Sequence, residues 1–260
     1  MPRLSCRSAA LECRLTPWDE RVFGHRCAEI TALEMVDAAD LGPLLARFND
    51  WALQEQVAFA YGRFPPTAAI KAAFHEAGFY FAEASYRLRH ARIQQSTALD
   101  ALARPGPVLQ AAQPADLAGV QDILAEDFHH GRIHEDPWVD PADAARRNRN
   151  WLADLQAQRH DILSYHLKGE LIGLHVQRAA GTGAAVEWVL TGVKRSHALL
   201  GVSLWAEVMK WNRAQGIREV HTLISAANVP ILNLYRRLDF QFESLLIGFH
   251  RRYRHDKNPL

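Results

Sequence analysis

Hydrophobic and polar residues alternate along the chain in two patterns, one typical of strands and the other of helices. Between residues 105 and 255, apolar residues recur at helical spacing in four segments, at 117–124, 141–156, 200–214 and 229–238. Short apolar runs typical of strands lie at 107–112, 162–167, 171–176, 184–191, 219–224 and 240–253. This order, β-α-α-β-β-β-α-β-α-β, predicts an α/β fold (an α+β arrangement with a mixed sheet) that carries helices on its faces.

The first hundred residues predict a smaller α/β unit. The run VAFAY (57–61) is typical of a buried strand, a helix over 67–77 follows Pro65-Pro66, and another strand covers 79–88. A similar succession of helix, Gly or Asp, Phe-x-Phe and strand recurs at 231–242. The N-terminal unit is therefore either a degenerate half-copy of the second domain or an unrelated unit built from the same elements.

A break in the pattern separates these two parts of the chain. Residues 92–108 lack a long apolar face and contain Pro105-Gly106-Pro107, which neither a helix nor a central strand accommodates well. We therefore predict two domains, an N-terminal α/β unit over residues 1–103 and a larger domain over residues 104–260.

Composition narrows the class of protein. The 260 residues are 48% hydrophobic and 23% charged, which is enough for a sizeable core without disulfides or metals. A formal net charge of +1 gives no general attraction to nucleic acid or anionic membranes, so we expect neither as a partner. The three cysteines, Cys6, Cys13 and Cys27, have no CxxC spacing, which argues against a disulfide framework and a four-ligand zinc site.

The amino-terminal residues and the longest apolar runs bear on localisation. Charged residues interrupt the first fifteen positions, MPRLSCRSAALECRL, so they contain no signal-peptide core. No apolar run approaches the roughly 20 residues that a membrane helix needs. We therefore expect a cytoplasmic protein.

One segment near the C-terminus carries a recognisable motif. Residues 228–240, NVPILNLYRRLDF, resemble the N-x-x-A-x-x-L-Y-x-x-x-G-F signature of the GCN5-related N-acetyltransferases (GNATs). Ile231 replaces the usual Ala, and Asp239 replaces the usual Gly. The order of elements over 105–255 is also similar to the core of that family. The resemblance implies a GNAT acyl-CoA N-acyltransferase fold, preceded by a smaller, partial GNAT-like α/β unit.

The resemblance implies roles for two residues of this motif. Tyr235 corresponds to the family's general acid, because a phenol is protonated at pH 7 and can donate to a leaving thiolate. The alternative is a half-buried aromatic residue of the helix. Asn228 is expected to contact the pantetheine arm of coenzyme A, or to satisfy backbone groups where two strands part.

A basic segment precedes the predicted helix at 200–214. In the family, a glycine-rich loop here holds the coenzyme pyrophosphate at the helix N-terminus, where N–H groups favour anions. This chain keeps only Gly201 of the expected glycines and has Leu199 at the middle position. The residues of this segment that we expect to bind acetyl-CoA, as a co-substrate, are Lys194, Arg195, Ser196, Leu200 and Gly201.

The preceding strand is expected to complete the donor site. Val189, Leu190 and Thr191 would present backbone groups to the acetyl carbonyl and to pantetheine, and donors there can stabilise an oxyanion. Glu187 lies four residues before Thr191 and shares its face in a regular strand. We interpret Glu187 as the base that deprotonates the amine, acting through a water molecule. The alternative is a solvated or ion-paired glutamate of the strand.

Residues 128–138, FHHGRIHEDPW, fall between the first two helices of the larger domain, where the family covers its acceptor. Arg132 suits a phosphate or carboxylate, and Trp138 suits stacking. The clustered His and carboxylate residues have no fixed metal-ligand spacing, so we expect no metal. A plain polar loop is the alternative.

Two stretches narrow the resemblance. Residues 16–24, TPWDERVFG, resemble the W-[DE]-x-x-x-F-G opening of the TDP-fucosamine acetyltransferase family, and residues 128–151 resemble its acceptor-side segment. This resemblance implies a partial N-terminal domain and acetyl transfer to the 4-amino group of a nucleotide-linked deoxysugar. Arg132 and Trp138 would then contact the nucleotide.

Three functions follow from these observations. The first is an N-acetyltransferase that moves an acetyl group from acetyl-CoA to a primary amine of a small molecule, such as an amino sugar on a nucleotide. The glycine-poor loop leaves two others open. One is an acyltransferase that uses an acyl carrier protein or a long-chain acyl thioester, and the other is a catalytically silent GNAT-like protein that binds a ligand or partner. The acceptor and the oligomeric state stay open, and a homodimer is compatible with the sequence.

Overall fold

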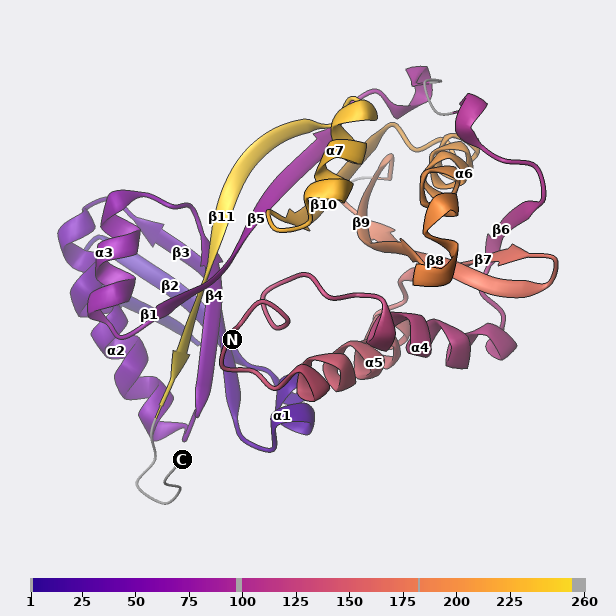
Figure 1. Cartoon of the computed structure of the whole chain (residues 1–260). Helices are drawn as coiled ribbons and strands as arrows, with labels where there is room; N and C mark the ends of the chain where they lie inside the picture. The colour runs from indigo at the N-terminus through magenta and orange to yellow at the C-terminus, as the bar shows by residue number, and fades with distance from the viewer. Residues whose placement is uncertain (1, 97–99, 182, 254–260) are drawn as a thin grey trace. The chain divides into compact units, whose positions relative to one another are not determined.

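The computed structural model describes residues 2–96, 100–181 and 183–253, which form two compact units (Figure 1). The first unit contains residues 2–85, 135–139 and 245–253, and the remaining described residues form the second. Strands β5 (Tyr80–His90) and β11 (Gln241–Arg252) contribute residues to both units. No helix within the described residues is both long and apolar enough to cross a lipid bilayer.

The first unit is a mixed sheet with three helices. Its strands follow the order β1 (Arg3–Cys6), β2 (Ala9–Leu15), β3 (Cys27–Met35), β4 (Phe59–Phe64), β11 and β5. Its helices are α1 (Pro17–Phe23), α2 (Leu41–Gln54) and α3 (Ala68–Glu76). The apolar faces of α2 and α3, which include Phe48 and Phe74, are buried with the strands in one core.

The second unit is a sheet covered by helices on both faces. Its strands follow the order β11, β5, β10 (Glu219–Ser225), β9 (Ala185–Val193), β8 (Glu170–Ala179), β7 (Asp161–Leu167) and β6 (Pro107–Ala111). Strands β6 to β9 are antiparallel, whereas β9 and β10 are parallel.

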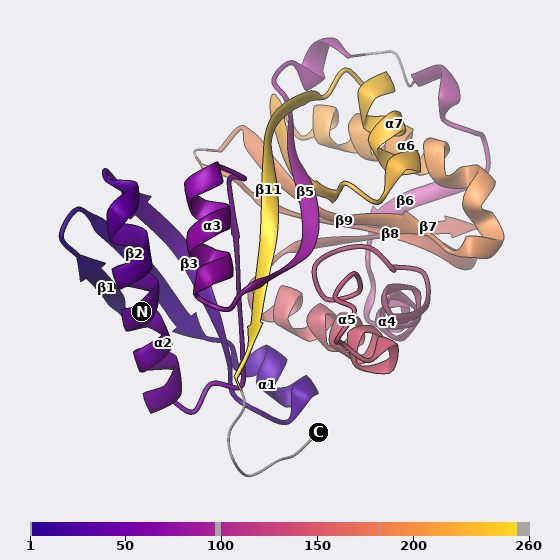
Figure 2. The same ribbon diagram turned by 60° about the vertical axis from the view of Figure 1, so that its left-hand side comes forward.

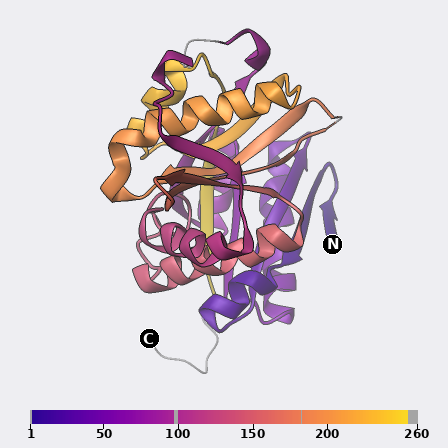
Figure 3. The same ribbon diagram turned by 90° about the vertical axis from the view of Figure 1, so that its right-hand side faces the viewer.

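Two pairs of helices cover the two faces of this second sheet. Helices α4 (Leu117–Glu126) and α5 (Pro141–Ala157) lie on one face, and α6 (Gly201–Ala214) and α7 (Val229–Arg237) on the other (Figure 2). Figure 3 shows α6, in orange, crossing the strands on the side away from α4 and α5. Trp188 and Trp205 belong to the core under α6 and α7, whereas Leu174 and Val176 belong to the core under α4 and α5.

The α/β fold with a mixed sheet is as predicted, and the elements of the larger domain are present. Every helix and strand predicted after residue 104 begins within one residue of its expected start. The strand predicted at 57–61 instead begins at Phe59, because Val57 donates its backbone N–H to Ala52 and closes the end of α2. Five elements before it, β1, β2, α1, β3 and α2, were absent from the prediction.

The compact units divide the chain at other points than the predicted domains do. Residues 86–96 and 100–103, which the prediction groups with the N-terminal unit, pack in the second unit. Residues 135–139 and 245–253 pack in the first. Residues 97–99 of the expected boundary lie outside the described residues. The chain therefore passes between the units several times instead of once.

The first unit repeats a succession of elements found in the second. The order β3–α2–β4–α3–β5 matches β9–α6–β10–α7–β11, and each parallel pair in these successions is joined by four residue pairs. Thr67 and Asn228 cap the N-termini of α3 and α7 by accepting a backbone N–H three residues on. Gly78 and Asp239 follow these helices with positive φ, of 81° and 59°. These shared features favour the half-copy interpretation.

Candidate functional site

Strands β9 and β10 part in the middle of the second unit's sheet. They pair in parallel from Ala185 opposite Glu219 to Trp188 opposite Thr222, and both strands continue beyond this last pair. The Thr222 hydroxyl donates to the Trp188 carbonyl oxygen at 3.0 Å, at the point where the pairing ends. Past it, no further pair joins β9 to β10 in the described part of the chain, so backbone groups of β9 face the fork.

A β-bulge lies on β9 just inside this fork. Val176 of β8 is opposite Leu190, but the next residue, Gln177, is opposite Trp188, so Val189 is an extra residue without a partner in the register. Such a bulge redirects the backbone and breaks the alternation of side chains between the two faces. The predicted donor-site backbone, 189–191, therefore lies where β9 leaves its regular pairing.

The bulge separates two predicted site residues. Thr191 Oγ1 lies 2.8 Å from His175 Nδ1, and the imidazole packs edge-on against Trp188 under α6 and α7. Glu187 lies on the opposite face, opposite Arg178, whose guanidinium Nε donates to its Oε2 at 2.7 Å. The expectation that Glu187 shares the face of Thr191 is wrong, because the extra residue shifts the period of two.

The phenol of Tyr235 lies at the fork on the α6 and α7 side. Its side chain is 1% exposed, and its ring packs edge-on against Phe240 with 4.7 Å between the centroids. Burial raises the pKa of the phenol to about 12, and the nearby polar side chains of Trp205, Thr222 and Thr191 oppose this rise. Tyr235 therefore keeps its proton at pH 7 and is a hydrogen-bond donor there.

Asn228 lies at the start of α7, after the end of β10. Its backbone N–H donates to the Ser225 carbonyl at 3.1 Å, and its side-chain Oδ1 accepts from the Ile231 N–H at 3.4 Å. These contacts give Asn228 the role of an N-cap, in which a side-chain oxygen satisfies a helix N–H. The structure thus supports a local role for Asn228, and contact with a coenzyme stays a prediction.

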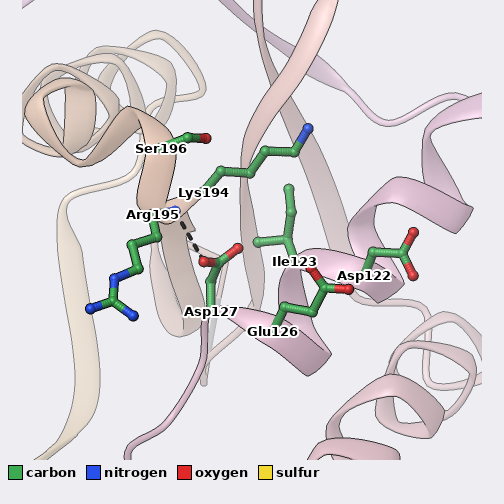
Figure 4. A pocket seen from close by; sticks show the side chains of 7 residues that line it. All are labelled: Asp122, Ile123, Glu126, Asp127, Lys194, Arg195 and Ser196. Carbon is green, nitrogen blue, oxygen red and sulfur yellow. Dashed lines mark hydrogen bonds between the residues drawn. The ribbon is translucent and has the colours of Figure 1, made fainter.

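A hollow of about 170 Å³ lies between the end of α4 and the segment that leads into α6 (Figure 4). The backbone N–H of Arg195 donates to Asp127 Oδ1 at 3.0 Å, and Lys194 Nζ lies 3.2 Å from Glu170 Oε1. The residues that line the hollow are Asp122, Ile123, Glu126, Asp127, Lys194, Arg195 and Ser196. The predicted pyrophosphate segment therefore borders a hollow that carries both signs of charge.

The segment Arg195–Leu200 forms a 3-10 helix that runs into α6. Leu199, at the middle glycine position of the family pattern, is 93% exposed, so its side chain does not fill the hollow. A Cβ at Gly201 would meet Val193 Cγ2 at 3.9 Å, an ordinary contact distance. Packing within the described residues therefore does not require a glycine at position 201.

Solved structures provide the decisive comparison. No protein-family model and no curated protein matches this sequence. A GCN5-related N-acetyltransferase from Sphaerobacter thermophilus superposes with a TM-score of 0.68 at 14% identity, over 95% of this chain and 78% of that chain. A tandem GNAT protein from the clavulanic acid biosynthesis pathway gives a TM-score of 0.64 at 14% identity, over 94% and 79%. A GCN5-related N-acetyltransferase from Kribbella flavida gives 0.58 at 12% identity, over 98% and 90%.

The chain has the GNAT fold. The expectation drawn from residues 228–240 and from the order of elements is confirmed at the level of fold. The likeness extends over nearly the whole chain and includes a protein described as a tandem GNAT, so it covers both compact units.

The segment that the sequence predicts to bind pyrophosphate carries groups that suit an anion. The Arg195 N–H already donates to a carboxylate oxygen, Lys194 and Arg195 carry positive charge, and Ser196 adds a hydroxyl. Asp127 holds the same N–H and would compete with a phosphate for it. In the described part of the chain, no group of three or more His, Cys, Asp or Glu side chains is placed to hold a metal ion.

The two predicted acceptor residues belong to different units of the GNAT fold. Arg132 is half-buried in the second unit, whereas Trp138 belongs to the first unit and is 68% exposed. The Trp138 N–H donates to Asp136 Oδ1 at 2.8 Å, and its carbonyl accepts from Arg252 at 2.6 Å. The backbone of Trp138 is therefore held on both sides while its indole faces solvent.

Residues 16–24, which resemble the opening segment of the TDP-fucosamine acetyltransferase family, have a packing role in the first unit. The Asp19 side chain is fully buried and accepts a hydrogen bond from the Tyr61 hydroxyl. Phe23 packs edge-on against Phe59 at 5.8 Å, and Gly24 ends α1 with a φ of 72°. Packing and chain geometry therefore account for Asp19, Phe23 and Gly24. These contacts give no information about an acceptor.

Sequence reasoning missed three residues of the site. His175 and Thr222 are polar residues within apolar strand runs. A polar residue in such a run indicates a buried side chain with a hydrogen-bond partner. Asp127 follows α4 and meets Arg195 across 68 positions of the sequence, so no local pattern indicates its contact. The fork therefore carries more polar groups than the motif alone indicates.

Proposed function

We propose that the protein is an N-acetyltransferase that moves an acetyl group from acetyl-CoA to a primary amine of a small molecule. The observation that carries this proposal is the buried Tyr235 phenol, whose ring lies 6.3 Å from that of Trp188, the last residue of β9 that pairs with β10. A protonated donor at an open strand edge is what an acyl transfer needs where the thiolate leaves. The likeness of fold supports the same class of reaction.

The donor half of the site is the N-terminus of α6 together with the open edge of β9. Acetyl-CoA would supply the activated acyl group. Lys194, Arg195 and Ser196 would hold its pyrophosphate, since helix N-termini and cations favour anions. Backbone groups of 189–191 would hold the pantetheine and polarise the acyl carbonyl.

The acid and the base of the reaction lie on opposite faces of the sheet. Tyr235, under α6 and α7, would donate its proton to the departing thiolate. Glu187, on the face of α4 and α5, would take a proton from the amine through water, and Arg178 orients its carboxylate.

The acceptor we propose is a small molecule with a primary amine, such as an amino sugar on a nucleotide. Arg132, which belongs to the second unit together with the proposed donor site, would contact a phosphate or carboxylate of the acceptor. Because the fold hosts many acceptors, the chemistry of the site is a better guide to the acceptor than the fold itself.

Calorimetric titration with acetyl-CoA tests the donor, and release of free thiol with a panel of amino sugars and other small amines tests the reaction. We expect saturable heat with acetyl-CoA and amine-dependent thiol release. Replacing acetyl-CoA with longer acyl donors tests the choice of acyl group. Binding without thiol release for any amine would reject the enzymatic proposal in favour of a binding protein.

A catalytically silent GNAT-like protein is the second candidate. Two observations favour it: Tyr235 is only 1% exposed, and Asp127 occupies the Arg195 N–H that a phosphate would use. No heat with acetyl-CoA or coenzyme A at any accessible concentration would support this candidate over the enzyme.

A further inference from the structure

A second titratable side chain lies beside Glu187, on the neighbouring strand β10. His221 is opposite Glu187 in the parallel register of β9 and β10, one position before the pairing ends. The preceding residue, Val220, is buried in the core under α6 and α7, so alternation along the strand turns His221 toward the opposite face. His221 therefore shares a face with Glu187 and lies next to the fork.

A carboxylate of the same strand holds the imidazole of His221. His221 Nε2 lies 2.6 Å from Glu219 Oε1. The Arg89 guanidinium, on β5, donates to this carboxylate twice at 2.8 Å, from Nε to Oε1 and from Nη2 to Oε2. Strand β10 lies between β5 and β9, so these three side chains connect two adjacent strands (Figure 1). Hydrogen bonding from Arg89 lowers the pKa of Glu219, so this carboxylate is ionised at pH 7.

This arrangement determines which nitrogen of His221 can take up a proton. An ionised carboxylate only accepts hydrogen bonds, so the proton of a neutral imidazole lies on Nε2 and points to Glu219. Nδ1 is then an acceptor, and it has no hydrogen-bond partner among the described residues. The side chain is 31% exposed, so a small molecule can reach the ring. A carboxylate that orients an imidazole and fixes its tautomer is the arrangement of a histidine general base.

Glu187 is less suited than His221 to take up a proton near neutral pH. Two guanidinium nitrogens of Arg178, Nε at 2.7 Å and Nη2 at 2.5 Å, donate to its Oε2. A carboxylate ordinarily titrates near about pH 4 and an imidazole near about pH 6.5, and a base works best when its pKa is close to the working pH. The charged or titratable groups near His221 are Glu219, Arg89 and Glu243 toward β5 and Glu187, Arg178 and His160 toward β9.

We propose that His221 is a catalytic base of the acetyl transfer and that Glu219 is its positioning residue. This role rests on the proposed function, and it gives His221 the proton that Glu187 would otherwise take. The amine nitrogen bonds to the acyl carbon while its proton moves to His221 Nδ1. The carbon–sulfur bond then breaks, and the thiolate takes the proton of Tyr235. The imidazolium afterwards loses its proton to water and the phenolate regains one, which restores the starting state.

Nitrogen NMR of labelled imidazoles tests the hydrogen-bond arrangement without any substrate. At about pH 8.5 we expect a His221 signal typical of a neutral ring protonated at Nε2, and His221→Gln identifies that signal. Glu219→Gln should give a mixture of tautomers, because a neutral amide can donate to Nε2 as well as accept from it. A wild-type ring protonated at Nδ1 would overturn the proposal, because Nδ1 could not then take the proton of the amine.

Steady-state kinetics with an active amine test the catalytic role. We expect His221→Gln to lower kcat about 100-fold at pH 7 with the KM for acetyl-CoA unchanged, because an amide can keep the hydrogen bond to Glu219 but cannot take a proton. The loss should shrink toward pH 9, where more of the amine is unprotonated in solution. Glu219→Gln should lower kcat about tenfold, because the imidazole remains but its tautomer is no longer fixed.

His166→Gln is the matched control for these measurements. It removes another imidazole of the second unit that lies beside a carboxylate, at 3.1 Å from Asp116 Oδ1, but on β7, two strands beyond β9 in the sheet. We expect its kcat to equal that of the wild type. Circular dichroism of each variant establishes that it is folded.

The outcomes separate this inference from the proposed function. If folded His221→Gln keeps kcat within twofold of the wild type at pH 7, or if Glu187→Gln loses more than His221→Gln does, His221 is not the base and the proposal fails alone. If the wild type releases no thiol with any amine, the proposed function fails and this role fails with it.

Discussion

Asp127 Oδ1 accepts a hydrogen bond from the backbone N–H of Arg195 at 3.0 Å, in the segment that we propose to bind the pyrophosphate of acetyl-CoA (Figure 4). In the proposed function, the carboxylate thus occupies a hydrogen-bond donor that the pyrophosphate would use. The contact joins the end of α4 to the entrance of α6, so it also ties together two sides of the hollow.

Asp127→Ala is expected to strengthen the binding of coenzyme A. The change frees the Arg195 N–H and removes one negative charge from the hollow, so we predict a Kd about three- to tenfold lower, measured by calorimetry. Asp122→Ala is the matched control, because it removes the same charge from the lining without touching that N–H. If Asp127→Ala instead weakens binding, Asp127 supports the segment and does not compete with the coenzyme.

Tyr235→Phe is expected to lower kcat about 100-fold while leaving the affinity for acetyl-CoA within twofold. The phenyl ring keeps the packing against Phe240 and Trp205, so only the proton donor is lost. Burial raises the pKa of Tyr235 to about 12, so the phenol stays protonated between pH 6 and 9. Removing the phenol should therefore leave the shape of the kcat–pH profile unchanged over that range. An unchanged kcat in steady-state measurements would rule out Tyr235 as the acid.

The periodicity of the larger domain predicts its elements because each helix there has one apolar face and each strand a compact apolar run. The first unit is harder to predict from sequence. Strand β2 alternates the buried Leu11 and Cys13 with the half-buried Glu12 and Arg14, and the apolar face of α2 begins beside Gly42-Pro43, which interrupts the helical pattern. Charged residues within a strand and a proline in the first turn of a helix weaken the sequence signal of elements that tertiary packing stabilises.

The motif predicts the position of Tyr235 but not the groups around it. Thr222 and His175 form hydrogen bonds with residues of β9 only because β8, β9 and β10 lie side by side, a relationship that no local pattern contains. The bulge at Val189 likewise depends on the register between two strands, and it moves Glu187 to the other face. Site geometry therefore needs the fold, even where the motif indicates the chemistry.

Asp239→Gly is expected to stabilise the protein by about 0.5–1 kcal/mol. Asp239 follows α7 with a φ of 59°, a left-handed conformation that costs a side chain free energy and suits glycine. The equivalent position after α3 is Gly78, with a φ of 81°. Chemical denaturation measures the change, and Asp239→Asn is the control, because it removes the charge and keeps the side chain. Equal stabilisation by both variants would assign the effect to charge.

Asp136→Asn is expected to destabilise the first unit by about 3 kcal/mol. The Asp136 carboxylate accepts from the Tyr80 hydroxyl at 2.8 Å and lies 2.7 Å from His250 Nδ1, and both carboxylate and imidazole side chains are fully buried. An amide offers only one oxygen, so one of these donors, or the Trp138 N–H, loses its acceptor. Chemical denaturation followed by circular dichroism measures the loss, and Asp50→Asn at an exposed position is the control.

The same carboxylate predicts how stability depends on pH. Burial raises the pKa of Asp136, but hydrogen bonds from His250 and from the Trp138 N–H outweigh it and leave the pKa below the usual 3.8. A lowered pKa in the folded state stabilises the protein above pH 3.8, and that contribution is lost as the pH falls through the folded value. The wild type should therefore lose stability below about pH 4 more steeply than Asp136→Asn does, in denaturation series from pH 3 to 7. Parallel curves for the two proteins would show that folding does not lower the pKa of Asp136.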